Sequence, residues 1–372
     1  MAFDPTELFL RKKFRGYYET HYIRGPPAIE TREFGFGGWG RKIENRHISF
    51  NSEKEMNTYL ARNAPLFVSY STAQYKYPTA EMARKEWICA ELVFDIDANE
   101  VGSPCSKEHG KNWVCEKCMS ATKDAIYRLI EEFLTKDFGL KKDEISLNFS
   151  GNRGYHLHLN SGFETLSSYA RREIADYVNG RGLSYESLFR QDPVTKKIVG
   201  PKPSDGGWRG RIARIFIEKI KERDLETIGV SPKIVKKFYS MNVISSIERG
   251  NWEVVYISDR KKFIGNVLQK ITTLYGSNVD EQVTMDSTKL IRLPESLHGE
   301  TGMTAMWVKN LDKFDPFTDP VVFSDNEITL YVESAPKFTL KNKDYGPYTN
   351  QVVTLPEYAA IYLIGKKCAK LQ

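Results

Sequence analysis

The stretch that most constrains this chain is Glu91–Asp97, an apolar run interrupted by two carboxylates. Successive side chains of a strand point to opposite faces, so Asp95 and Asp97 share one face while Phe94 and Ile96 point into a core. Two ionised carboxylates side by side repel each other, and a divalent cation with oxygen ligands relieves that repulsion. The run therefore predicts a strand with a candidate Mg²⁺ or Mn²⁺ site. The alternative is a strand end whose acids merely face water.

The composition limits the class of protein. The chain has 372 residues, of which 41% are hydrophobic and 27% charged, so it can bury a sizeable core in one large domain with an insertion or in two domains. No run approaches the length of a membrane span, and Met1 to Arg11 lacks the basic-then-apolar order of a signal peptide. We therefore expect an intracellular protein with no membrane contact. The net charge of +6 fits ordinary surface lysines as well as a nucleic-acid partner.

Three of the five cysteines cluster with a histidine in the pattern Cys105-x3-His109-x5-Cys115-x2-Cys118. The odd total and the clustering favour a metal site over a disulfide framework. Four such ligands close a tetrahedral site, and three cysteines with one histidine are a known structural zinc set. The pattern predicts a zinc knuckle over residues 105–118 with no open position for catalysis. Unligated cysteines and a redox-active pair are the alternatives.

A glycine-flanked arginine and two histidines follow in Ser150–Gly154 and the strand-like segment 155–159. His156 and His158 share one face of that predicted strand. Arg153 and His156 beside a turn of small residues form a candidate phosphate site, because guanidinium and backbone N–H groups satisfy phosphate oxygens at close approach. The alternative is a pair of structural histidines.

Helical periodicity replaces alternation in the middle of the chain, over 168–180 and 207–224. We therefore predict an α/β (α+β) body of mixed sheets flanked by helices, formed by 1–165 and 250–372, with an inserted helical subdomain at 166–249. The insert carries several basic residues, which could meet a phosphate backbone but more commonly form a solvated face. These are Lys196, Lys197, Lys202, Arg209, Arg211 and Arg214.

The rest of the chain alternates between strand and helix patterns. A first helix begins after Asp4-Pro5, because aspartate caps and proline suits the first helical turn. Strand patterns cover 252–257 and 321–332, a helix covers 258–275, and a terminal helix covers 354–370.

A third carboxylate and another Arg/His pair lie in the C-terminal third. Asp280 precedes Lys289–Gly299, a short strand and proline turn that contain Arg292 and His298. A lone metal-binding strand would not predict this third carboxylate or the additional Arg/His pair.

These motifs carry a resemblance to a known family. Phe94–Asp97, the Cys/His cluster, Ser150–His156 and Leu290–Gly299, in this order, resemble the catalytic small subunit of archaeal/eukaryotic-type DNA primase, and the archaeal branch more closely. The resemblance spans about Glu33 to Gly302. Where the family has a small residue before the turn arginine, this chain has Asn152.

The resemblance implies a prim-type fold with a structural zinc knuckle and a variable helical insert. It implies that Asp95, Asp97 and Asp280 hold two catalytic Mg²⁺ or Mn²⁺ ions. Five residues would bind the triphosphate of the incoming nucleotide, namely Ser150, Arg153, His156, Arg292 and His298. Glu33 and Arg46 match positions near the active site.

The implied function is synthesis of short RNA primers on single-stranded DNA from NTPs, in the cytoplasm or nucleoid. DNA primers made from dNTPs are left open. The implied partner is a primase large subunit in a heterodimer, with Leu8, Phe9 and the terminal helix as candidate contacts. Other classes also remain: a prim-fold repair or gap-filling polymerase, a metal-dependent nuclease using Asp95, Asp97 and His156, and a non-catalytic zinc-containing DNA-binding subunit.

Overall fold

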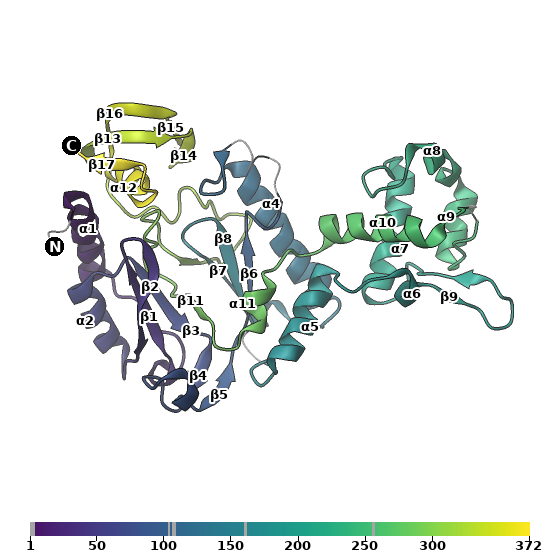
Figure 1. The fold of residues 1–372 in the computed structure, drawn as a ribbon, viewed down its shortest axis with the longest axis horizontal. Coiled ribbons are helices and arrows are strands. Elements are labelled where there is room, and N and C mark those ends of the chain that lie inside the picture. The colour runs from purple at the N-terminus through teal and green to yellow at the C-terminus, as the bar shows by residue number, and fades with distance from the viewer. Residues whose placement is uncertain (1–3, 103–104, 106–108, 160–161, 255–256) are drawn as a thin grey trace. The chain divides into compact units, whose positions relative to one another are not determined.

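The computed structural model of the chain describes residues 4–102, 105, 109–159, 162–254 and 257–372. The chain divides into two compact units (Figure 1). Unit 1 comprises Met1–Asp124, Lys142–Arg172 and Val279–Gln372, and unit 2 comprises Ala125–Lys141 and Glu173–Asn278. In the described part of the chain, no helix combines the length and apolar character needed to cross a membrane.

The first sheet of unit 1 has the strand order β11-β3-β1-β2. Its strands are β1 (Phe34–Gly38), β2 (Arg41–Ile48), β3 (Phe67–Ser71) and β11 (Leu290–Arg292). The strands β1 and β3 are buried throughout, whereas β2 is an exposed edge. Gly37 permits the tight β1–β2 hairpin, because a Cβ there would lie 2.3 Å from the carbonyl oxygens of Arg41 and Lys42.

Two helices lie beside each other in the N-terminal part of unit 1, α1 (Pro5–Thr20) and α2 (Glu53–Asn63) (Figure 1). The predicted cap of α1 is confirmed, since Asp4 Oδ1 accepts the N–H of Thr6 at 3.0 Å. Leu8 is exposed on this helix.

The second sheet of unit 1 has the order β12-β7-β8-β6. Its strands are β6 (Leu92–Asp97), β7 (Ile145–Phe149), β8 (Gly154–Leu159) and β12 (Met306–Trp307). In the β6–β8 register Asp95 faces His156, and Phe94 faces Leu157. Every side chain of β8 is buried, so the apolar face of this sheet belongs to the core.

The predicted α/β class is confirmed, but the expectation of mixed sheets is wrong. Each strand pairing in the described residues is antiparallel. Short turns such as the one between β7 and β8 can join only antiparallel neighbours, because a parallel pair needs a long crossover. The remaining small hairpin of the N-terminal half joins β4 (Ala73–Tyr75) to β5 (Trp87–Ala90).

The C-terminal region forms a three-stranded sheet, a hairpin and a buried helix. The elements are β13 (Glu327–Ala335), β14 (Phe338–Leu340), β15 (Lys343–Tyr345), β16 (Tyr348–Pro356), α12 (Glu357–Gly365) and β17 (Ala369–Leu371). The predicted strand at 321–332 begins only at Glu327. The predicted helix at 354–370 is wrong at both ends, because Thr354 still pairs with Thr329 in a strand that ends at Pro356, and Ala369 of β17 pairs with Val332. All of α12 is buried, so it is not an exposed partner surface.

Unit 2 is mainly helical. It contains η3 (Arg128–Thr135), a π-helical segment, the hairpin β9 (Arg190–Gln191) and β10 (Ile198–Val199), and the helices α6 (Tyr185–Leu188), α7 (Gly207–Glu222), α8 (Pro232–Val235), α9 (Met241–Glu248) and α10 (Arg260–Tyr275). Two further helices, α4 (Glu116–Tyr127) and α5 (Ser168–Asn179), have residues in both units. The Ser277 N–H donates to the Val178 carbonyl at 3.0 Å, so the chain returns to the end of α5 after α10.

Two sequence expectations in unit 2 need correction. The predicted strand at 252–257 is absent over its described part, because Glu253 and Val254 form a turn and the Trp252 indole donates to Pro201 O at 2.8 Å; residues 255 and 256 lie outside the described residues. Arg211 does not belong to a basic surface. It is buried and pairs with Asp137 at 3.0 Å.

Candidate active site

The three predicted carboxylates converge on the C-terminal end of β6. Asp95 and Asp97 point to the same face of this strand. The Asp280 N–H donates to the Asp95 carbonyl at 2.9 Å, which fixes Asp280 beside the strand. Asp280 also caps the short helix α11 (Glu281–Met285), with Oδ1 accepting the Gln282 N–H at 2.8 Å. Segments separated by almost two hundred residues in sequence therefore bring their acids together.

A fourth carboxylate, which the sequence reasoning missed, joins this cluster. The Glu100 N–H donates to the Asp97 carbonyl at 2.9 Å in the turn after β6. Burial and the charges of Asp280 and Asp97 raise the pKa of Glu100 to about 7. Burial and repulsion from Asp97, Glu100 and Asp280 raise the pKa of Asp95 to about 8. Crowded carboxylate oxygens are the donor set that Mg²⁺ and Mn²⁺ prefer, so these residues fit a hard divalent cation.

Two predicted phosphate-binding residues lie directly beside the acids. Arg153 Nε donates to both carboxylate oxygens of Asp97, at 2.9 and 2.8 Å. His156 Nε2 is 3.8 Å from Asp95 Oδ1. This contact is not an ion pair, because burial and the positive charges of His158 and Arg292 lower the pKa of His156 well below 6.5. A neutral His156 can donate one hydrogen bond to a ligand.

Two further predicted triphosphate-binding residues, Arg292 and His298, belong to the first sheet and to the loop that follows β11. Arg292 is buried, donates to Val68 O at 3.2 Å and has its guanidinium 5.1 Å from the centre of the Phe67 ring. Burial lowers its pKa to about 10, so it remains charged at neutral pH. His298 Nδ1 accepts the Glu300 N–H at 3.2 Å, which leaves the ring proton on Nε2. Burial and the surrounding cations lower the pKa of His298 well below 6.5.

The turn Ser150–Gly154 touches the loop that contains His298. This contact links the residues beside the acids to those of the first sheet and its loop. Gly151 has φ +82°, and a Cβ there would lie 2.9 Å from the His298 Cβ. The Thr301 hydroxyl donates to Gly151 O at 2.6 Å. Ser150 Oγ accepts the Gly154 N–H at 3.3 Å, which braces the turn. The structure thus places the Ser150–Gly154 turn against the loop that carries His298.

Glu33 and Arg46 form an ion pair in the first sheet. Arg46 Nε and Nη2 donate to the two oxygens of the buried Glu33 at 3.0 and 3.2 Å, and Lys85 Nζ lies 3.5 Å from the same carboxylate. Burial opposes ionisation of Glu33, but these cations outweigh it and lower its pKa. These contacts give the pair a structural role.

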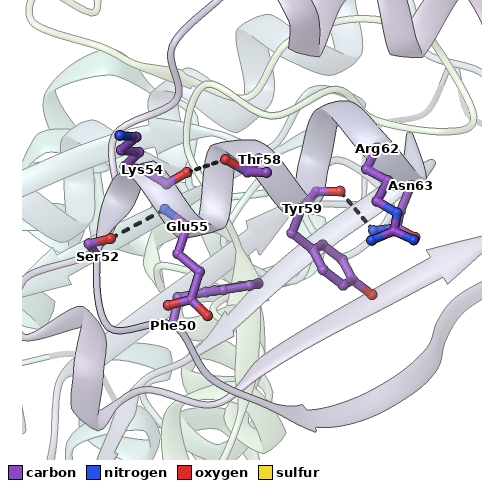
Figure 2. A pocket seen from close by; sticks show the side chains of 8 residues that line it. All are labelled: Phe50, Ser52, Lys54, Glu55, Thr58, Tyr59, Arg62 and Asn63. Atoms are coloured by element: carbon purple, nitrogen blue, oxygen red, sulfur yellow. Dashed lines mark hydrogen bonds between the residues drawn. The ribbon is translucent and has the colours of Figure 1, made fainter.

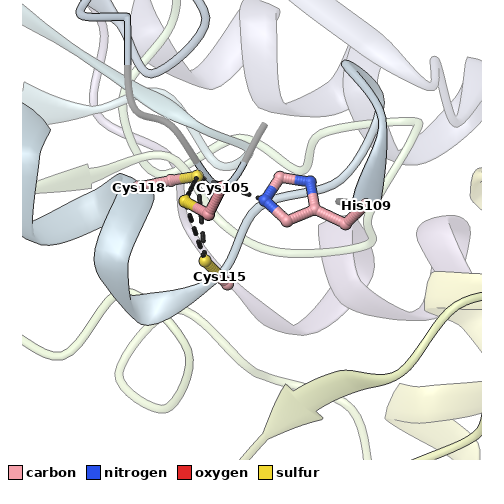
Figure 3. Close-up of side chains that lie close together, drawn as sticks. All are labelled: Cys105, His109, Cys115 and Cys118. Carbon is pink, nitrogen blue, oxygen red and sulfur yellow. Dashed lines mark hydrogen bonds between the residues drawn. The ribbon is translucent and has the colours of Figure 1, made fainter. Parts of the chain in front are cut away.

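The four predicted zinc ligands come together in unit 1 (Figure 3). Their ligand atoms all lie within 4.8 Å of one another, and Cys105 Sγ is 3.0 Å from Cys118 Sγ and 3.4 Å from Cys115 Sγ. The ring of His109 donates from Nδ1 to Gly110 O at 2.9 Å, which leaves Nε2, 3.2 Å from Cys118 Sγ, free to bind a metal. Residues 106–108 of the predicted knuckle lie outside the described residues.

The donor chemistry of this cluster fits a metal such as zinc. Burial and hydrogen bonds from neighbouring thiols raise the pKa of Cys118 to about 12, so a bound cation is needed to hold it as the thiolate. Four ligands complete a tetrahedral site, which is the arrangement of structural zinc.

A pocket of about 590 Å³ lies elsewhere in unit 1, against α2 (Figure 2). Its walls combine two aromatic rings with charged and amide side chains, and none of the predicted site residues lines it. The lining residues are Phe50, Ser52, Lys54, Glu55, Thr58, Tyr59, Arg62 and Asn63.

Comparison with known proteins supports the family resemblance. The family described as DNA primase small subunit matches residues 94–309, a span that contains all the predicted metal, nucleotide and zinc ligands but not Glu33 and Arg46. A DNA primase small subunit PriS of Methanococcoides burtonii is 35% identical, over 98% of this chain and 98% of the relative. This chain belongs to the DNA primase small subunit family. Further relatives with that name come from Nitrosopumilus maritimus (30% identical, 98% of each chain) and Methanothrix thermoacetophila (32% identical, 99% of each chain).

All predicted metal, nucleotide and zinc ligands of this primase small subunit lie in unit 1. They come from the three separate chain segments that make up the unit. The additional residue Glu100 also lies within the family match. An acid three positions after Asp97 was the only sequence signal that could have pointed to it.

Proposed function

We propose that the carboxylate cluster at the end of β6 is the catalytic centre of this primase small subunit. Membership of the family makes the chain a nucleotidyltransferase that synthesises primers for DNA replication. The observation that carries the proposal is that the acids lie against groups able to bind phosphate, since Asp95 faces His156 across β6 and β8 and Asp97 binds Arg153. Nucleotidyl transfer from a triphosphate needs acids and phosphate-binding groups at one place, because divalent cations bridge carboxylates and phosphates.

In this proposal Asp95, Asp97 and Asp280 hold two Mg²⁺ or Mn²⁺ ions, with Glu100 adjacent. When bound, these ions would activate a primer 3′-hydroxyl and stabilise charge on the attacked α-phosphate. Arg153 already lies against Asp97, so its guanidinium is in place for phosphate oxygens near the carboxylates.

The triphosphate would be bound by the other predicted residues. Neutral His156 and His298 donate hydrogen bonds, the charged Arg292 supplies attraction from a buried position, and Ser150 presents its hydroxyl at the turn. These groups are anchored by the contacts of Gly151 and Val68, so little reorganisation is needed when the nucleotide binds.

The wider proposal follows the family resemblance. The substrates are single-stranded DNA and NTPs, with dNTPs left open, and the partner is a primase large subunit in a heterodimer. The four-ligand cluster holds structural zinc, unit 1 contains a prim-type catalytic fold, and residues 166–249 belong to a variable helical subdomain. The enzyme works where chromosomal DNA lies, in the cytoplasm or nucleoid.

The test is incorporation of labelled NTPs and dNTPs on unprimed single-stranded DNA with Mg²⁺ or Mn²⁺. Asp95→Asn and Asp97→Asn keep the side-chain shape but remove the charge. We expect each to reduce synthesis by about 100-fold or more, the range found when a group that stabilises transition-state charge is lost. Glu19→Gln, on an exposed position of α1, is the control and should retain full activity.

Other outcomes identify the alternatives. Full activity in both aspartate variants would overturn the metal assignment. Extension of a primed template without any unprimed synthesis would favour a gap-filling polymerase, and release of nucleotides from DNA without NTPs would favour a nuclease.

A further inference from the structure

We propose that Lys366, the residue after α12, is an additional ligand for the phosphates of the incoming nucleotide, and that Asn152 positions it. The inference rests on the proposed nucleotide site and adds to it a residue from the far C-terminal end of the chain. Sequence reasoning placed residue 366 within a terminal helix and gave it no role.

Lys366 is held beside the Ser150–Gly154 turn. Its ammonium donates to Asn112 O at 2.7 Å and to Asn152 Oδ1 at 3.0 Å. Both acceptors are neutral, and within the described residues no carboxylate oxygen lies within ion-pair distance of Nζ. The third N–H of the ammonium therefore remains for another acceptor. Glu300 acts on Lys366 only from beyond ion-pair distance, so this half-buried cation would be further stabilised by a ligand that supplies negative charge at Nζ.

The positive charges near Lys366 point to the sign of that ligand. The charges of Arg292, Lys42, Lys366 and Arg153 all act on His298, so they surround one part of the site. Burial lowers the pKa of Lys366 to about 8, yet the side chain is still mainly protonated at pH 7. Four cations around a neutral histidine match a ligand with several negative charges, as the terminal phosphates of a nucleoside triphosphate have.

Glu300 offsets only part of this charge. Its carboxylate accepts from Asn152 Nδ2 at 3.1 Å and lies 3.9 Å from Lys42 Nζ. The orientation of the Asn152 amide is consequently determined, because its NH₂ group faces a carboxylate and its oxygen faces an ammonium. Asn152 is the residue that departs from the small side chain of the family pattern, and the structure gives it a positioning role in this chain.

The experiment measures primer extension on a primed template, so that initiation does not enter. The variants are Lys366→Met, Lys366→Arg and the control Lys367→Met, which removes the neighbouring lysine near the Trp39 ring. We expect Lys366→Met to raise the KM for NTP about tenfold, as for loss of a charged hydrogen bond. The kcat and the affinity for single-stranded DNA should change less than about twofold. Lys366→Arg should recover part of the KM, and Lys367→Met should leave all three quantities unchanged.

Several results would overturn the inference. An unchanged KM for NTP in Lys366→Met would do so, and so would weaker DNA binding with an unchanged KM, which would assign Lys366 to the nucleic-acid backbone. If Lys366→Met does not fold, Asn152→Ala keeps the lysine but removes its acceptor, and we expect its KM for NTP to rise about threefold; an unchanged KM would again contradict the inference.

Failure of this inference can be distinguished from failure of the proposed function. Asp95→Asn and Asp97→Asn test the catalytic centre and do not depend on Lys366. Loss of synthesis in those variants, together with normal nucleotide kinetics in Lys366→Met, would leave the active site in place and remove only the additional ligand.

Discussion

Glu91 binds two buried groups at once, and this contact sets the strongest stability prediction for a single residue. Its carboxylate accepts from Arg32 Nη2 at 2.5 Å and lies 3.0 Å from His158 Nδ1. The side chain of Arg32 is only 2% exposed and that of Glu91 20%. Replacing Glu91 with glutamine would leave a buried guanidinium without its carboxylate. We expect Glu91→Gln to lower the free energy of unfolding by about 3 kcal/mol at pH 7.

The same contact predicts a pH dependence with a definite sign. Burial opposes ionisation of Glu91, but the hydrogen bonds and charges of His158 and Arg32 outweigh it, so its pKa in the folded protein is lowered. A lowered carboxyl pKa stabilises the fold above the unfolded-state pKa of about 4.3, and this contribution is lost as pH falls through the folded-state pKa. The difference between wild type and Glu91→Gln should therefore shrink below about pH 4 in urea titrations.

Glu333→Gln is the matched control for this measurement. It breaks the Lys370–Glu333 pair, whose side chains are 62% and 50% exposed, and should leave the free energy of unfolding nearly unchanged, because solvent screens an exposed ion pair. Equal effects of the two substitutions would contradict the argument from burial.

The zinc cluster makes a prediction about an element, the loop that precedes α4. Trp113 in this loop packs 5.6 Å from the Phe338 ring and 5.7 Å from the Tyr362 ring, between centroids. Loss of the metal should therefore also loosen the C-terminal sheet region. We expect one zinc ion per chain by atomic absorption, and a fall of about 5–10 °C in melting temperature for Cys115→Ser or after chelation.

Cys89→Ser tests whether the effect is specific to the cluster. Cys89 is a half-buried free thiol outside the four ligands, so this variant should keep its zinc. A wild-type protein with no bound zinc and unchanged stability after chelation would remove the structural role of the cluster.

Local patterns predicted elements well where the determining interactions are local. The alternation at Phe94–Asp97 was enough for β6, and the Asp4-Pro5 pair was enough for the start of α1. The terminal segment was predicted less well, because pairing with β13 holds Thr354 in a strand although the apolar spacing that follows is helical. Trp252 illustrates the same limit, since a long-range hydrogen bond to Pro201 decides its conformation.

At the scale of the whole molecule, the site is assembled from segments that only the fold brings together. A backbone hydrogen bond from the Asp280 N–H to the Asp95 carbonyl places these two residues side by side, and Lys366 reaches the turn at Asn152 from the C-terminal end. Sequence motifs could predict residues that lie within recognisable patterns. They could not predict Glu100 or Lys366, whose roles depend on what lies next to them in space.

All of the proposed ligands for metal and nucleotide lie in unit 1, and this predicts how the two units respond to ligand. A ligand stabilises the folded unit that binds it, by about 2.7 kcal/mol at 100 times its Kd. Amides that exchange through opening of unit 1 should therefore exchange more slowly with Mg²⁺ and NTP, by up to about 100-fold. Hydrogen exchange read by mass spectrometry should show this protection in β6, in 150–156 and in 290–302, whereas α7 should exchange as before.

The aspartate variants make this comparison decisive. Asp95→Asn and Asp97→Asn remove charges that would hold the cations, so added Mg²⁺ and NTP should protect unit 1 much less in these variants. Protection of α7 equal to that of β6 in the wild type would mean that unit 2 contributes ligand contacts or opens together with unit 1. Protection confined to unit 1, and lost with the two carboxylates, is the result expected if the nucleotide binds where the acids of β6 meet the arginine and histidines around Gly151.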